Sequence, residues 1–102
     1  MDPRPPRLYV VVRSNISRSQ QAIQCGHAVA KFVKEYPDVW PNRTLLYLRV
    51  ADEESLLSLY EKIKSLSQNH VIYTDPSWNT ATSFGVFGSP EVQEALKGLS
   101  LI

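Results

Sequence analysis

The chain has 102 residues, 43% of them hydrophobic and 21% charged, which suits one small globular domain over residues 1–102 and excludes a second. Its longest apolar runs are too short to span a bilayer and its first residues lack the features of a secretory signal, so we expect a cytoplasmic protein. The formal net charge of +1 hides a split, because eight basic residues oppose three acidic ones in residues 1–49 and three oppose seven in residues 50–102.

That split suggests a basic face able to bind a polyanion, although an uneven but purely solvating surface explains it as well.

The first predicted element is a strand, because residues 7–13 read RLYVVVR, a β-branched run typical of a buried strand. A helix follows, with apolar residues at helical spacing. Ser17 and Gln20 fit a capping box, so the helix should begin near Ser17 and end by Pro37.

The second half of the chain continues the alternation of strands and helices. After a loop at 37–43, it predicts a strand at 44–50, a helix from the cap Asp52 to about Ser67, strands at 70–74 and 81–87, and a terminal helix that begins at Ser89 and Pro90. The order is therefore β-α-β-α-β-β-α. Strands joined through helices predict an α/β fold whose sheet is mainly parallel or mixed, with helices packed on it.

The first predicted helix carries an unusual polar line. Gln20, Gln24, His27 and Lys31 are separated by four, three and four residues, so they share one side of the helix. The line begins at the helix N-terminus, just beyond the C-terminal end of the first strand. Ligands bind at that edge of open α/β sheets, and the positive end of the helix dipole favours a developing negative charge there.

Each of these residues also has a simpler interpretation. Gln20 can be only the capping partner of the serine, Gln24 a surface amide, and His27 a structural histidine bonded to a backbone carbonyl. Cys25 is most simply a small core residue, since nothing near it in the sequence would lower its pKa. A zinc site needs more ligands than Cys25, His27 and His70 offer, so we expect no metal.

The segment VVVRSNI…QQAIQCGHAVAKF resembles the signature of the type 2 peptidyl-tRNA hydrolase family, which reads roughly V-V-R-x-D-L and then G-K-x-A-A-Q-C-x-H-A. The matching residues are Arg13, Ala22, Gln24, Cys25, His27 and Ala28. The likeness continues through LYLRVADEESLLSLYEKIKSL and covers nearly the whole chain. It implies a single three-layer domain with a four-stranded mixed sheet and helices on both faces.

The chain departs from the family pattern at two places. Gln20 stands where members usually carry a lysine, and DPSWN replaces D-A-G-x-T, with Asp75 on the aspartate and Asn79 on the threonine. Thr82 matches the threonine of the family's T-V-L-A-I-G-P. The spacing of Asp75, Asn79, Ala81 and Thr82 is similar to a divergent branch of the superfamily, the peptidyl-tRNA hydrolase domain-containing proteins.

The resemblance implies hydrolysis of the ester that joins a peptide to the terminal ribose of tRNA, with no metal and no cofactor. Such a site must orient a water, assist its deprotonation and stabilise the oxyanion. Asp75 could hold the water or accept its proton, Gln24 could orient that water or donate to the oxyanion, and Thr82 could support Asp75 or the substrate. Gln20 belongs to the catalytic set as the lysine's replacement. The simpler alternative for Asp75 is a turn residue before Pro76.

Substrate binding would fall to the basic half of the chain. The candidate substrate-binding residues are Arg13, Arg18, His27, Lys31, Lys34 and Asn79, which would meet the 3′ end of a tRNA carrying a peptidyl or acyl ester. Trp78 could stack on a terminal base or simply pack. The alternative function is that of a catalytically weak RNA-binding module with the same fold, because the lysine is missing. The sequence does not decide whether the chain forms a homodimer.

Overall fold

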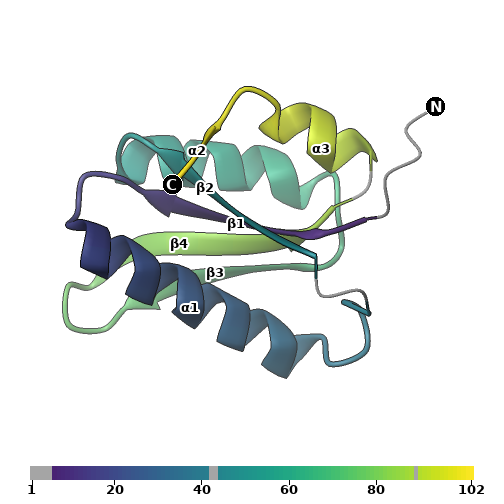
Figure 1. Ribbon diagram of the computed structural model, residues 1–102, viewed down its shortest axis with the longest axis horizontal. Helices are drawn as coiled ribbons and strands as arrows, with labels where there is room; N and C mark the ends of the chain where they lie inside the picture. The colour runs from purple at the N-terminus through teal and green to yellow at the C-terminus, as the bar shows by residue number, and fades with distance from the viewer. Residues whose placement is uncertain (1–5, 42–43, 89) are drawn as a thin grey trace.

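A computed structural model describes residues 6–41, 44–88 and 90–102. Its strands are β1 (Leu8–Arg13), β2 (Leu45–Val50), β3 (His70–Asp75), β4 (Thr80–Phe87) and β5 (Ser100–Leu101), and its helices are α1 (Arg18–Glu35), α2 (Glu53–Lys64) and α3 (Pro90–Leu96) (Figure 1). The α/β class and the mixed sheet are confirmed. The sequence predicts that the last helix begins at Ser89 and Pro90. Pro90 is the first residue of α3, and Ser89 lies outside the described residues.

The sheet has the strand order β3-β4-β1-β2-β5. Strand β1 pairs in parallel with β2 and antiparallel with β4, while β3 pairs antiparallel with β4 and β5 antiparallel with β2. The prediction of four strands in the order β-α-β-α-β-β-α is therefore wrong, because β5 follows α3 as a fifth strand. Its two residues are exposed and carry no alternating pattern, so their pairing with Leu48 and Arg49 comes from tertiary contact.

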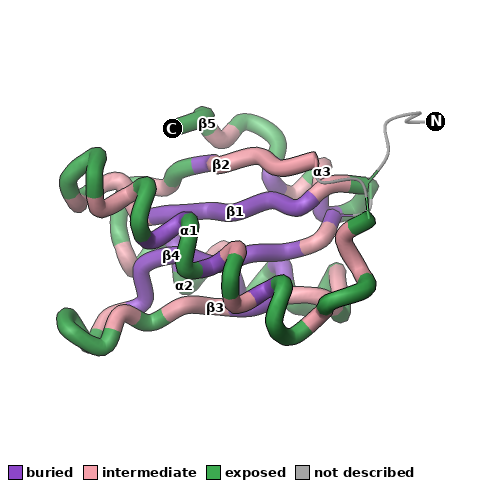
Figure 2. Tube along the Cα trace, turned by 60° about the horizontal axis from the view of Figure 1, so that its bottom comes forward, coloured by how far each residue is buried: buried purple, intermediate pink, exposed green. Residues whose placement is uncertain are grey.

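Helices cover both faces of the sheet, as expected, with α1 on one face and α2 and α3 on the other (Figure 1). Alternate residues of β1 divide between two cores, since Leu8, Val10 and Val12 pack with α1 whereas Tyr9 and Val11 pack with α2 and α3. Strands β1 and β4 are buried over most of their length (Figure 2). A central strand buried on both faces explains the nearly continuous apolar run VVV.

The helix ends follow local hydrogen bonds. The side chain of Ser17 accepts a hydrogen bond from the backbone N–H of Gln20, so the predicted N-cap of α1 is present. Helix α2 ends at Lys64 rather than near Ser67. The Ser65 hydroxyl donates to the carbonyl of Lys62, a local bond that competes with continuing the helix, and the Ser67 hydroxyl donates to the carbonyl of Phe87.

Candidate active site

The first turns of α1 lie beside the connection between β3 and β4, at one end of the sheet (Figure 1). Gln24 of α1 meets Asp75, the last residue of β3, through a hydrogen bond of 2.8 Å from Nε2 to Oδ2. Thr82 of β4 donates from Oγ1 to Gln24 Oε1 at 2.7 Å. Helix α1 and the β3–β4 hairpin therefore bring together three of the residues that the sequence singled out.

The Thr82 hydroxyl determines which way the Gln24 amide points. Because a hydroxyl donates to the amide oxygen, the amide NH₂ group is left facing the Asp75 carboxylate, and the reverse orientation would set oxygen against oxygen. Gln24 is 1% exposed and Thr82 fully buried, so water does not compete for these bonds. The interpretation of Gln24 as a surface amide is wrong, because its side chain lies between α1 and the sheet.

Gln20 completes the cluster on the solvent side. Its Oε1 accepts from Gln24 Nε2 at 3.3 Å, a longer bond than the one to Asp75. With its oxygen turned toward Gln24, Gln20 presents its own NH₂ as a neutral donor at the position where the family carries a lysine. Gln20 therefore does more than cap α1, although its backbone also bonds to the Ser17 side chain.

A β-bulge places Thr82 in this cluster. The pairing of β3 with β4 shifts register between Tyr73 and Thr74, so that Tyr73 pairs with Ser83 and Thr74 with Ala81, which leaves Thr82 as the extra residue. The Ser83 hydroxyl donates to the Gln24 carbonyl at 2.7 Å. Two consecutive residues thus bond to the same residue of α1, whereas regular alternation would point them to opposite faces.

Asp75 is held as a carboxylate. The Gln24 amide lowers the pKa of Asp75 below its ordinary value, helped by the backbone N–H groups of Ser77 and Trp78 and by the positive charge of His27, while burial opposes the shift. The Ser77 N–H lies 2.8 Å from Oδ1. Asp75 is therefore a turn residue as well as a member of the cluster, and it is ionised at neutral pH.

Asn79 closes the same turn. Its backbone N–H donates to the Asp75 carbonyl at 2.7 Å, and its φ of 54° lies in the left-handed region, which asparagine tolerates better than most residues. Substrate binding by its exposed side chain stays a prediction.

His27 and Lys31 continue the polar line along α1 toward the edge strand β3. The exposed His27 ring stacks on Tyr73, with ring centroids 4.6 Å apart and planes 13° from parallel. Lys31 Nζ donates to the carbonyl of Ile72 at 2.7 Å. The line predicted from sequence therefore faces β3, and the Lys31 ammonium is engaged with the backbone of that strand.

The other basic candidates are spread over the molecule. Arg13 Nε donates to Asn15, and Arg18 lines a cavity with Gln21 and Arg49 on the β2 side of α1, away from the Gln24 side chain. Lys34 is exposed and stands ten residues beyond Gln24, or about 15 Å along the helix axis. Arg18 thus does not occupy the place of the family lysine, and Lys34 lies far from the cluster.

Cys25 faces the core between α1 and the sheet. It is fully buried, and burial raises its pKa to about 12. A thiol held neutral in this way is a core residue rather than a nucleophile. Within residues 6–41, 44–88 and 90–102, no group of three or more His, Cys, Asp or Glu side chains is placed to hold a metal ion.

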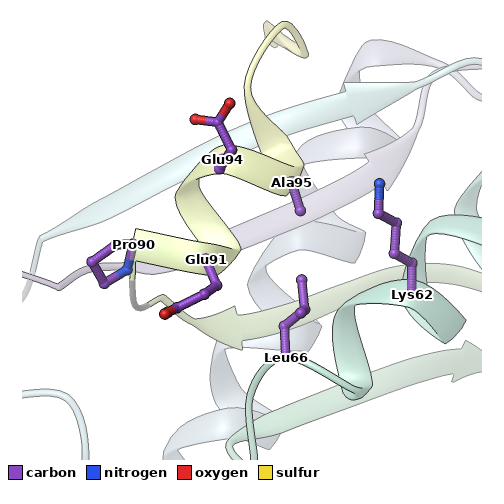
Figure 3. A pocket seen from close by; sticks show the side chains of 6 residues that line it. All are labelled: Lys62, Leu66, Pro90, Glu91, Glu94 and Ala95. Atoms are coloured by element: carbon purple, nitrogen blue, oxygen red, sulfur yellow. The ribbon is translucent and has the colours of Figure 1, made fainter.

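The larger cavities lie elsewhere. One of about 520 Å³ opens between α2 and α3 and is lined by Lys62, Leu66, Pro90, Glu91, Glu94 and Ala95 (Figure 3). Another of the same volume lies between α3 and strands β1 and β2. Neither includes Gln24, Asp75 or Thr82, of which the first and last are buried and Asp75 is half-buried. Among the described residues, no helix combines the length and apolar character needed to cross a membrane.

Comparisons with known proteins give a family and a fold. A model of the peptidyl-tRNA hydrolase PTH2 family matches residues 7–102. No curated protein matches the chain. Among solved structures, a protein of unknown function from Agrobacterium tumefaciens strain C58 is similar with a TM-score of 0.72, 10% sequence identity and coverage of 95% of this chain and 97% of that chain. At this identity the likeness shows the fold alone.

Proposed function

Since the chain belongs to the peptidyl-tRNA hydrolase PTH2 family, we propose that it hydrolyses the ester of peptidyl-tRNA or of an N-blocked aminoacyl-tRNA and releases free tRNA. The observation that supports this proposal is the hydrogen-bonded chain from Thr82 through Gln24 to Asp75. These residues stand at the positions that match the family motifs, and they converge from α1 and two strands at one end of the sheet. The ester would reach this cluster at Asp75, the member of the three that is not fully buried.

In the proposed reaction, Asp75 holds the attacking water and takes its proton as the water oxygen bonds to the ester carbon. The bond from that carbon to the ribose oxygen then breaks, and the proton passes from Asp75 to the ribose oxygen as free tRNA leaves. A carboxylate with a lowered pKa is a weak base, so its main contribution is to position the water beside a fixed negative charge. Gln24 fixes the carboxylate, and Thr82 fixes Gln24. The Gln20 NH₂ is the donor that would meet the oxyanion, because both ends of the Gln24 amide already carry hydrogen bonds.

The exchange of lysine for Gln20 has a definable cost. A hydrogen bond to a charged group is worth roughly 1.5–3 kcal/mol, which corresponds to about one to two decades of rate if it forms only in the transition state. A loss of that size would leave measurable turnover, because enzymes accelerate reactions by about 10⁶-fold or more. The RNA-binding module without turnover remains the second candidate, because Gln20 is a neutral donor in place of an ammonium.

The substrate's terminal nucleotide would lie along the seam between α1 and β3. His27 is one helical turn beyond Gln24, and Tyr73 is two residues before Asp75, so the stacked rings border the cluster. The outer face of the exposed His27 ring offers a surface for a base, and base stacking on aromatic rings is worth about 1–3 kcal/mol. Arg13 and Arg18 would meet the phosphates, with Lys31 and Lys34 further along α1.

The test is incubation with N-acetyl-aminoacyl-tRNA and, separately, with free aminoacyl-tRNA, following release of the acyl group. Release from the blocked substrate should fall by roughly 10²-fold or more in Asp75→Asn and in Gln24→Ala. Asp38→Asn, in the exposed turn after α1, is the matched control and should retain activity.

The double variant separates shared from independent roles. Gln24→Ala combined with Asp75→Asn should lose less than the product of the single losses, because Gln24 acts through the Asp75 carboxylate. Salt-dependent binding of tRNA without release of the acyl group would instead establish the binding module. Failure to bind tRNA would remove both candidates.

A further inference from the structure

Strand β4 extends past the end of its pairing with β1. The last paired residues are Val12 and Ser83, yet β4 begins at Thr80, so the segment with Ala81 and Thr82 has no partner in β1. Ala81 is 7% exposed, and a buried N–H requires an acceptor. Glu53, the first residue of α2, supplies it, because its Oε2 accepts from the Ala81 N–H at 2.8 Å.

This contact lies next to the bulge. Thr82 is the extra residue of the bulge, and both of its neighbours are tied down, Ala81 by Glu53 on one side and Ser83 by the Gln24 carbonyl on the other. We propose that Glu53 is a positioning residue of the active site: it holds the backbone at Ala81 so that the Thr82 hydroxyl orients Gln24 toward Asp75. The expected effect on kcat rests on the proposed function. The expected effect on the orientation of the Gln24 amide rests on the hydrogen bonds alone.

A general effect of charge must be separated from this contact. Glu53 and Glu54 are both acidic residues in the first turn of α2, where negative charge stabilises a helix through its dipole. Glu54 is exposed and shares the charge and the helical turn. Substitutions at Glu54 therefore reproduce the dipole effect and serve as matched controls.

Two conservative variants divide the properties of Glu53. Glu53→Asp keeps the charge but shortens the side chain by one methylene, about 1.5 Å, which takes the carboxylate out of hydrogen-bond range of Ala81. Glu53→Gln removes the charge but keeps an oxygen acceptor at the same reach. We expect Glu53→Asp to lower kcat for N-acetyl-aminoacyl-tRNA by about 10-fold or more with little change in KM, because small misplacements of a catalytic group are costly. Glu53→Gln, Glu54→Asp and Glu54→Gln should stay near the wild-type rate.

The side-chain amide of Gln24 gives a readout that does not depend on turnover. Its NH₂ resonances in nitrogen-15 NMR spectra should shift in Glu53→Asp and stay in place in Glu53→Gln and in both Glu54 variants. If Glu53→Gln loses as much rate as Glu53→Asp, or if Glu53→Asp behaves like Glu54→Asp, the positioning role is overturned. A wild-type chain without turnover would remove the proposed hydrolase function, and the amide resonances would still decide whether Glu53 orients Gln24.

Discussion

Thr82→Val is the most direct perturbation of the candidate site. The substitution keeps the shape of the side chain and removes the hydroxyl that donates to Gln24 Oε1 at 2.7 Å. Because Thr82 is fully buried and Gln24 is 1% exposed, the amide oxygen is left without a donor and without water. An unsatisfied buried acceptor costs about 1–3 kcal/mol of folding free energy. The amide also loses the hydrogen bond that helps to hold its NH₂ group toward Asp75, so kcat should fall by about 10²-fold, the scale of a lost positioned group.

Urea unfolding measures the stability change, and release of the acyl group from N-acetyl-aminoacyl-tRNA measures kcat. Ser83→Ala is the matched control, because it removes the neighbouring hydroxyl, whose partner is the Gln24 backbone carbonyl rather than its side chain. It should cost stability, about 0.5–1.5 kcal/mol, with a much smaller loss of kcat. Thr82→Ser should recover most of the rate. Equal kcat losses in Thr82→Val and Ser83→Ala would refute the orienting role of the threonine.

Asp75 stabilises the fold only while it is ionised, because its pKa in the folded state is lowered. The stability difference between wild type and Asp75→Asn should therefore be constant near neutral pH and shrink progressively below about pH 4. Urea midpoints measured at each pH would show this change. Cys25, with its pKa raised to about 12 by burial, should react with a thiol reagent at pH 8 only on unfolding, and rapid labelling of the native protein would contradict its core position. Arg18→Ala should weaken RNA binding and reduce by about one the slope of log binding constant against log salt concentration. An unchanged slope would show that Arg18 does not contact a phosphate. His27→Ala should raise KM by about 5-fold or more with little loss of kcat, and an equal effect on a substrate lacking the terminal base would exclude stacking.

Local sequence signals were sufficient for most of the fold. The VVV run of β1 is buried on both faces, and the capping residues Ser17 and Asp52 both accept the expected backbone hydrogen bonds. These features depend on residues within a few positions of one another, so a pattern can reveal them. Strand β5 depends on where α3 returns the chain, which no local pattern specifies.

The candidate site was only partly accessible to sequence reasoning for the same reason. The spacing of Gln24 placed it on a polar line, but its burial follows from the seating of α1 on the sheet. The side-chain role of Thr82 depends on a register shift between β3 and β4, and the Glu53 contact crosses from the opposite face of the sheet. Regular alternation fails at the bulge, and departures of this kind are expected at functional sites.

The replacement of the family's lysine by Gln20 changes which groups can stabilise negative charge beside Asp75. The Asp75 carboxylate is already negative, Lys31 is engaged with the Ile72 carbonyl, and Arg18 faces β2. Positive potential near Gln20 then comes from the N-terminal end of α1. In the proposed reaction, an oxyanion beside Asp75 would therefore be stabilised by neutral donors and a helix dipole, which are weaker than an ammonium. A substitution that returns the ammonium, Gln20→Lys, adds charge to the same hydrogen-bonded cluster without altering Gln24, Asp75 or Thr82.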